Sequence, residues 1–378
     1  MRLLAAFPII SLGPAFCPVA VLCLFCVPAV WPGFAAQPPP RGTAQEITVH
    51  GQSLEGNLES DSPNRKVSVY LPPSYSREPK RRYPVVYMLH GFNETNEKWF
   101  GSEQKWINLP EMLDRSIANG TVREFIVVVP DAYTKYQGSF FSNSIVTGNW
   151  EDFITTDLVR YIDAHYRTLP SRESRGLAGH SMGGYGTIRI GMKHPDVFGS
   201  IYAMSACCLM WGADFQPAGP VALKIGGIHT ENALDQADFS VRFHFAEAAA
   251  WSPNPENPPF YVDFPADAGE TPHPEVIAKW SANLPLAMID QYRKNLQRLN
   301  AIAFDVGDQD DFAHIPLGAK ALDKVLTGYR IAHTFEIYPG THISAIPERL
   351  EMKVLPFFSK NLVFGKQEKT TVSTIPAR

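Results

Sequence analysis

The pentapeptide Gly179-His180-Ser181-Met182-Gly183 decides the fold more than any other stretch of this chain. It follows the apolar run Gly176-Leu177-Ala178 and precedes small residues, from Gly184 to Ile188, that can begin a helix. This context predicts a sharp strand-to-helix turn, a nucleophile elbow, with a strained serine at its apex. The two flanking glycines let neighbouring backbone approach without a Cβ clash. Ser181 is therefore the expected nucleophile, and the amide of Met182 is expected to point at the same space.

A second turn with a matching pattern lies upstream. The run from Tyr83 to Leu89 has the pattern of a buried strand and ends in His90-Gly91-Phe92. A His-Gly turn at a strand end is where enzymes with a nucleophile elbow place their second oxyanion donor. We therefore expect this turn to lie beside Ser181.

An acidic turn follows the strand-like run from Ala301 to Gly307. It carries three carboxylates, and one of them is expected to orient the imidazole of a catalytic histidine and to stabilise its charged form. We choose Asp310, with Asp308 and Asp311 as alternatives. A solvated acidic turn or a calcium loop would be the competing interpretation, but the ligand spacing of an EF-hand loop is absent, and we expect no metal site.

The expected base is His342, which follows a strand-like stretch, Thr334 to Thr341, broken by Pro339-Gly340. A loop histidine at the carboxyl edge of a sheet can reach the serine. His314, close to the acidic turn, and His333, just before the last strand, are the competitors. The resulting order along the chain, Ser then Asp then His, is the one expected for this kind of elbow.

The composition is that of an ordinary globular protein and gives no sign of a nucleic-acid partner. The 378 residues carry a net charge of −4 with no basic stripe, so we expect no nucleic-acid binding. Strand-like runs alternate with helical patterns such as Ile154 to Tyr166 and about Pro347 to Leu362. This alternation predicts an α/β fold, with a mostly parallel sheet covered by helices on both faces. The expected core strands are 83–89, 125–130, 176–180, 199–204, 301–306 and 333–338.

The first 36 residues have the pattern of a secretory signal. Met1-Arg2 gives a positive start, a long apolar stretch runs to about Trp31, and small residues end it at Gly33 to Ala36. We expect a signal peptide over 1–36, cleaved near Ala35 or Ala36, and a secreted or periplasmic protein without a stable membrane span. The alternative is an uncleaved anchor. Only Cys207 and Cys208 would then remain, and we interpret them as small buried hydrophobes.

Residues 209–295 interrupt the alternation of strands and helices. Prolines crowd 252–274 and forbid a regular sheet or a long helix there. The region is also rich in aromatic residues, among them Trp211, Phe215 and Trp280. We expect a cap-like insertion over the serine that supplies an apolar substrate wall, with a surface excursion packed on the main core as the alternative. The catalytic domain is expected over 44–362, and the polar tail 365–378 is expected to be disordered.

Taken together, the motifs resemble the esterase D-like "putative esterase" family of α/β hydrolases. That family includes feruloyl esterases, S-formylglutathione hydrolases, enterochelin esterases and mycobacterial mycolyltransferases. The resemblance covers about 44 to 362 apart from the cap-like region. It implies the α/β-hydrolase fold, Ser181 as nucleophile, Asp310 as acid, His342 as base, and the amides of Phe92 and Met182 as the oxyanion hole. The segments that carry it are Val69 to Tyr75, Tyr83 to Gly91, Tyr161 to Asp163 with Tyr166 to Thr168, Gly179 to Gly186, and His194 to Phe198.

We therefore expect an exported serine carboxylesterase that needs no cofactor, with His90, Gly91, His180 and Trp211 in contact with the substrate. The expected substrate is a small-molecule or polysaccharide-linked ester, for example of a feruloyl or acetyl group. An acyltransferase with the same triad and a non-catalytic binding module on the same fold are the alternatives. The sequence does not decide the oligomeric state.

Overall fold

An eight-stranded sheet forms the centre of the protein. The computed structural model describes residues 39–103, 106–212, 216, 219–269 and 271–365. The expected signal peptide 1–36 lies outside the described residues, as does the expected tail 365–378 apart from Gly365. All the elements below belong to the unit that begins at Pro40.

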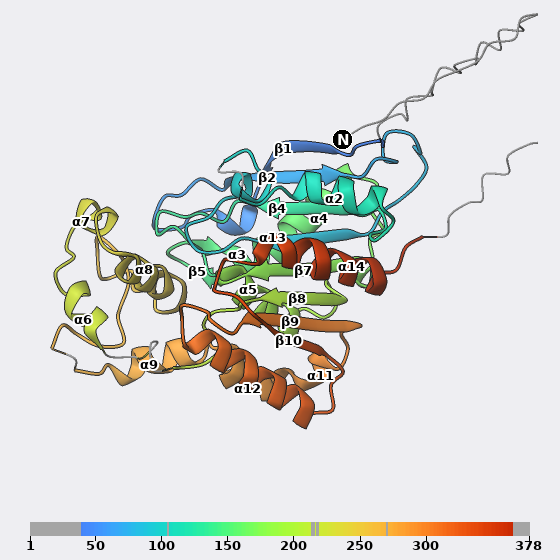
Figure 1. Ribbon diagram of the computed structural model, residues 1–378. Coiled ribbons are helices and arrows are strands. Elements are labelled where there is room, and N and C mark those ends of the chain that lie inside the picture. The colour runs from blue at the N-terminus through green and yellow to red at the C-terminus, as the bar shows by residue number, and fades with distance from the viewer. Residues whose placement is uncertain (1–38, 104–105, 213–215, 217–218, 270, 366–378) are drawn as a thin grey trace, which may run out of the picture. The chain divides into compact units, whose positions relative to one another are not determined.

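The strand order of the sheet is β1-β2-β4-β3-β7-β8-β9-β10 (Figure 1). Neighbouring strands run parallel from β4 to β10, whereas β1 pairs with β2 and β2 with β4 in antiparallel fashion. The predicted α/β fold with a mostly parallel sheet is therefore confirmed. The strands are β1 (Thr43–His50), β2 (Asn64–Leu71), β3 (Val85–Leu89), β4 (Ile126–Pro130), β7 (Arg175–His180), β8 (Ser200–Met204), β9 (Ala301–Gly307) and β10 (Thr334–Tyr338), with a separate hairpin of β5 (Asn143–Ser144) and β6 (Gly148–Asn149).

Helices cover both faces of the sheet because its central strands are apolar on both sides. Every residue of β3 and β4 is buried, as in parallel strands packed from two sides. Alternate β3 residues enter two different cores: Val86 and Met88 join one, Val85 and Tyr87 the other. The first core includes residues of α1 (Asn96–Trp99), α2 (Leu109–Ala118), α13 (Ile346–Arg349), η5 (Leu350–Val354) and α14 (Leu355–Asn361). The second includes residues of α3 (Trp150–Asp152), η2 (Phe153–Leu158), α4 (Val159–His165), α5 (Met182–Lys193) and α12 (His314–Gly328).

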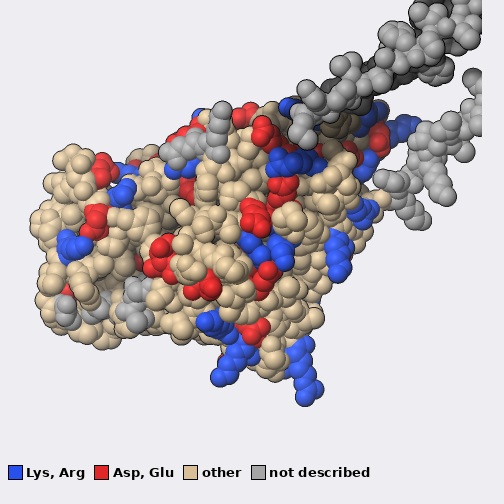
Figure 2. Space-filling model, in the orientation of Figure 1, with Lys and Arg blue, Asp and Glu red and all other residues tan. Residues whose placement is uncertain are grey.

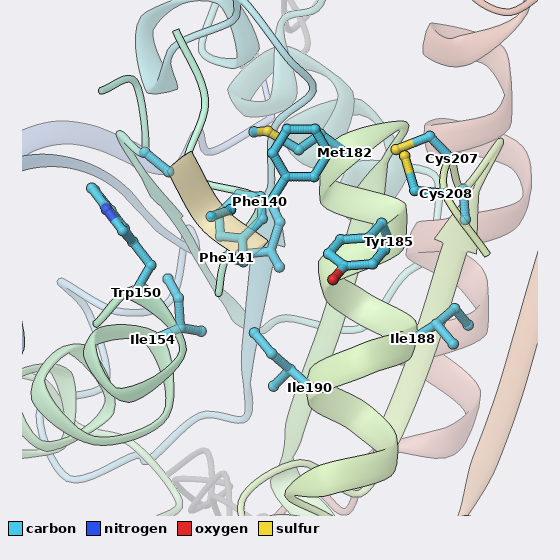
Figure 3. Close-up of a cluster of buried hydrophobic side chains, with 14 of the residues drawn as sticks. Phe140, Phe141, Trp150, Ile154, Met182, Tyr185, Ile188, Ile190, Cys207 and Cys208 are labelled. Atoms are coloured by element: carbon cyan, nitrogen blue, oxygen red, sulfur yellow. The ribbon is translucent and has the colours of Figure 1, made fainter. Parts of the chain in front are cut away.

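Helix α5 is the most deeply buried of these helices and carries the elbow serine at its start. Its residues from Met182 to Met192 are all buried. The Tyr185 ring lies 5.9 Å from that of Phe140, and its hydroxyl donates to the carbonyl of Asn283. Figure 3 shows Tyr185 directed toward Phe140, with Cys207 and Cys208 beside the first turn of α5. Both cysteines are free and buried, which confirms their interpretation as small hydrophobes.

The stretch between β8 and β9 has helices before and after a proline-rich segment. Between Trp251, the last residue of α8, and Pro274, the first residue of α9, the described residues form no helix and only two isolated bridges, as the prolines predict. Helix α8 carries apolar residues on almost all of its faces. Its residues Phe245 and Trp251 belong to the second of the two cores described above. The helices are α6 (Pro220–Ile225), α7 (Glu231–Asp235), α8 (Phe239–Trp251), α9 (Pro274–Ser281), α10 (Pro285–Met288), η4 (Ile289–Tyr292) and α11 (Arg293–Leu296), and short 3-10 turns occur at η1 (Gln52–Leu54) and η3 (Arg172–Ser174).

The surface carries both signs of charge. Figure 2 shows acidic and basic side chains interspersed on the face that it presents. Within the described ranges no helix has the length and apolar character that crossing a membrane requires.

Candidate active site

The strand-to-helix turn at Ser181 is as sharp as the sequence predicts. Strand β7 ends at His180, α5 begins at Met182, and Ser181 between them has φ 56° and ψ −116°. A Cβ on Gly179 would lie 2.3 Å from the carbonyl oxygen of Gly183, and a Cβ on Gly183 would lie 2.0 Å from that of Leu89. Real Cβ atoms do not approach backbone so closely, so both positions require glycine.

Ser181, His342 and Asp310 form one hydrogen-bonded chain, although they are far apart in the sequence. The Nε2 atom of His342 lies 2.9 Å from the Oγ atom of Ser181, and its Nδ1 atom lies 2.8 Å from Oδ2 of Asp310. A carboxylate only accepts, so Nδ1–H donates to Asp310 and leaves Nε2 free to accept the serine proton. The Asp310 side chain is completely buried, and its Oδ1 accepts the amide of Phe312 at 3.0 Å. The geometry is therefore that of a nucleophile, a base and an orienting acid.

Of the alternative acids and bases, Asp308 and His333 bind other groups. Asp308 is exposed, and its Oδ1 accepts the Gly340 amide at 3.1 Å, so it joins the acidic turn to the loop before His342. Asp311 is exposed. His333 contacts the carboxylate of Asp323 at 3.0 Å, beside α12. His314, at the start of α12, is buried and lines the pocket described below.

The two expected oxyanion residues lie close together. The elbow packs against the end of β3, where Gly183 touches the backbone of Leu89 and His90. The side chains of Phe92 and Met182 both lie next to Gly138. A Cβ atom built on Gly138 would lie 2.7 Å from the sulfur of Met182 and 2.8 Å from a ring carbon of Phe92. Met182 is the first residue of α5, where helix amides have no partner within the helix and carry partial positive charge. An oxyanion on the substrate would be stabilised there.

The turn that carries Phe92 is held by residues inside the protein. His90 is fully buried: its Nδ1–H donates to the carbonyl of Gly91, and its Nε2 accepts the amide of Ala132, both at 2.8 Å. Burial lowers the pKa of His90, which keeps the ring neutral. The Gly91 amide donates to Oε2 of Glu94 at 2.7 Å. The structure thus places His90 and Gly91, which the sequence predicts to contact the substrate, in hydrogen bonds with protein groups; their contact with the substrate stays a prediction.

His180 and Trp211, which the sequence also predicts to contact the substrate, have partners within the protein as well. The Nε2–H of the buried His180 donates to the carbonyl of His342 at 2.9 Å, and burial lowers the pKa of this ring to about 4. Trp211 stacks on Trp280 with ring centroids 6.1 Å apart and donates to Ser281. His180 thus supports the loop of the base, and Trp211 packs within the insertion. Neither they nor His90 and Gly91 are among the described residues that line the pocket at Ser181.

A small pocket opens beside Ser181, with a volume of about 100 Å³. Helix α8 forms one wall with Phe239, Ser240, Phe243 and His244; Phe312, His314 and Ile315 form another, and Cys207 and Val221 complete it. The walls are mostly apolar, as in sites that take the hydrophobic part of a ligand. The ring of Phe312 lies 5.1 Å from that of His342, at 83°.

The sequence does not indicate which residues of α8 form the wall of the pocket. A helix that is apolar all round has no one-sided pattern to show which residues face a site. Glu94 was also missed, although its place three residues after Gly91 is a local signal for a side chain that caps a turn. In the part of the chain that the structure describes, no group of His, Cys, Asp and Glu side chains is arranged to hold a metal ion.

The family model described as "Putative esterase" matches residues 60–344. The chain belongs to this family. The family predicted from the motifs is therefore confirmed, and the match spans the elbow, the acidic turn and His342.

Relatives of this "putative esterase" chain include larger proteins. An esterase of Mycobacterium tuberculosis is 31% identical over 290 residues, which are 74% of this chain and 53% of the relative. An endo-1,4-beta-xylanase/feruloyl esterase of Xylanibacter ruminicola is 30% identical over 162 residues, 42% of this chain and 21% of the relative. The chain thus spans about half, or less, of the length of these curated relatives.

Solved structures share the fold of this family member. A ferulic acid esterase aligns with a TM-score of 0.58 at 22% identity, covering 85% of this chain and 99% of the other. An S-formylglutathione hydrolase of Staphylococcus aureus aligns with a TM-score of 0.53 at 13% identity, covering 85% and 98%. At these identities the alignments establish the α/β-hydrolase fold.

Proposed function

We propose that the protein is an exported serine carboxylesterase that hydrolyses carboxylic esters through an acyl-enzyme. The observation that carries this proposal is the chain from Ser181 Oγ to His342 Nε2 at 2.9 Å and from His342 Nδ1 to Asp310 Oδ2 at 2.8 Å. Membership of the "putative esterase" family supports the same reaction. A non-catalytic binding module on this fold would not need a serine, a histidine and an aspartate joined by hydrogen bonds.

The first step is attack of Ser181 on the ester carbonyl. His342 takes the serine proton on Nε2, and the buried carboxylate of Asp310 stabilises the imidazolium that results. The carbonyl oxygen becomes an oxyanion and is held by the amides of Phe92 and Met182. Collapse of this intermediate breaks the C–O bond, and His342 gives its proton to the departing alcohol. The acyl group remains on Ser181.

Water completes the cycle. His342, neutral again, removes a proton from a water molecule, whose oxygen attacks the acyl-enzyme carbonyl. The same two amides hold the second oxyanion, and the proton returns from His342 to Ser181 Oγ as the acid leaves. These steps use only Ser181, His342, Asp310 and backbone amides.

The substrate that we propose is an ester attached to a polysaccharide, with a feruloyl or acetyl acyl group. Support comes from the apolar pocket beside Ser181 and from a relative named endo-1,4-beta-xylanase/feruloyl esterase. Export is supported by the signal-like pattern of residues 1–36. Cleavage at Ala35 or Ala36 would be visible as the N-terminal sequence of the mature protein.

The proposal is tested by ester hydrolysis with purified protein. The wild-type chain is expected to release acid from at least one of the two, an acetyl ester or a feruloyl ester, and Ser181→Ala is expected to lose at least about four orders of magnitude in kcat. Product analysis with an added alcohol acceptor shows whether water is the dominant acceptor. Activity that survives in Ser181→Ala, or transfer that outruns hydrolysis, would overturn the proposal.

A further inference from the structure

Phe239 lies at the junction of the walls that surround Ser181. It is the first residue of α8, lines the pocket, and remains 42% exposed. Because most large apolar side chains of α8 are buried, this exposure is unusual within the helix. Phe239 therefore borders both the pocket and solvent.

The ring of Phe239 contacts three others that belong to different parts of the site. It lies 5.4 Å from Phe92 at 86°, on the turn that carries the expected oxyanion donor. It lies 5.9 Å from Phe312, which packs against His342. On its own helix it stacks on Phe243 at 5.7 Å. Edge-to-face and stacked contacts between aromatic rings are favourable, so the ring is held in place from three sides.

The pocket behind Phe239 is smaller than an aromatic ring requires. Its volume is about 100 Å³, whereas an apolar cavity that binds benzene in another protein measures ~150 Å³. A polysaccharide alcohol cannot enter so small a space and must leave toward solvent. The group enclosed there is therefore the acyl group, which stays attached to Ser181 until water arrives.

We infer that Phe239 is the specificity-determining residue that limits the acyl group to short aliphatic acids, such as acetyl, and excludes aryl acids. This inference rests on the proposed function and narrows its two acyl groups, feruloyl and acetyl, to acetyl. The ring of Phe239 fills the space between Phe92 and Phe312. An acyl group with its own aromatic ring would need that space and is therefore excluded.

The test compares esters that share one leaving group and differ only in the acid. The 4-nitrophenyl esters of acetic, butyric, octanoic and benzoic acids are given to the wild type, Phe239→Ala, Phe239→Leu and Ile145→Ala. Ile145 is a matched control, because it is 53% exposed and is not among the described residues that line the pocket. Ser181→Ala reports the background.

The wild type is expected to prefer acetate over benzoate by roughly tenfold or more in kcat/KM, since a pocket discriminates by about that factor for each group that does not fit. Phe239→Ala is expected to lower this preference at least tenfold, Phe239→Leu by an intermediate factor, and Ile145→Ala by less than twofold. Equal use of acetate and benzoate by the wild type, or an unchanged preference in Phe239→Ala, would overturn the inference. Failure of the proposed function gives a different result: no ester is hydrolysed above the Ser181→Ala background.

Discussion

Replacing Asp310 by Asn tests the assignment of the acid within a turn that holds three candidate carboxylates. Oδ1 of Asp310 accepts the amide of Phe312, so the amide oxygen of the new side chain is expected to stay there. Its NH₂ group then faces Nδ1 of His342, where the carboxylate Oδ2 was at 2.8 Å. A donor facing Nδ1 stabilises the tautomer that carries its proton on Nε2. His342 can no longer accept the proton of Ser181.

The expected loss is about four orders of magnitude in kcat, or about 5.4 kcal/mol in the activation free energy. It is large because the Asp310 side chain is completely buried, so no water replaces the lost charge. Asp308→Asn is the matched control. Asp308 is exposed and uses Oδ1 to accept the Gly340 amide, which an amide oxygen does equally well. Its kcat is expected to change by less than about threefold.

The assay is single-turnover and steady-state hydrolysis of an acetyl ester by the two variants and the wild type. Near-ultraviolet circular dichroism shows that each variant is folded. The reasoning would be refuted if Asp310→Asn kept more than a tenth of the wild-type kcat. It would also be refuted if Asp308→Asn were the more damaging change, because the orienting acid would then be Asp308.

Three further predictions concern groups around the site. Glu94→Gln weakens the acceptor of the Gly91 amide (2.7 Å), so kcat is expected to fall roughly tenfold with KM little changed; a raised KM at constant kcat would contradict this. Burial holds the pKa of His180 at about 4, below its value of about 6.5 in the unfolded chain. As the pH falls from 6.5 to 4, the unfolded chain binds a proton on this ring before the folded chain does, so the free energy of unfolding decreases. The expected loss is about 3 kcal/mol, measured by denaturant unfolding at pH 7 and pH 4, and His180→Gln should lose less. Burial raises the pKa of Glu247 well above its usual range. As the pH rises above about 4.5, Glu247 ionises in the unfolded chain before it does in the folded chain, so the buried side chain lowers the free energy of unfolding. Glu247→Gln should therefore raise Tm more at pH 8 than at pH 4, and equal shifts would count against the argument.

The strands and the elbow could be predicted because local sequence determines them. Continuous apolar runs predict buried parallel strands, and 83–89 and 125–130 differ from β3 and β4 by one or two residues at one end. The glycines around Ser181 are required by contacts of 2.0 and 2.3 Å that any other residue would violate. The predicted helix from Ile154 runs through a π-helical segment, η2, which no spacing rule anticipates.

The direction of side chains at the strand ends could not be predicted. His90 and His180 belong to the motifs that surround the nucleophile, which suggested contact with substrate, but both rings turn into the protein and support backbone there. The pocket wall comes from α8, more than 50 residues after Ser181. Its place at the site depends on packing of the insertion, not on a motif. Phe239, which carries the inference on acyl size, therefore had no signal in the sequence.

The central claim is that Ser181 is an activated nucleophile, and covalent labelling tests it most directly. A fluorophosphonate is incubated with the folded full chain, with Ser181→Ala and with His342→Ala, and the labelled residue is identified by peptide mass spectrometry. We predict one phosphonyl group per wild-type chain, on the peptide that contains Ser181, none on Ser181→Ala, and strongly slowed labelling of His342→Ala. A folded wild-type chain that takes up no label, or a label on another residue, would contradict the account.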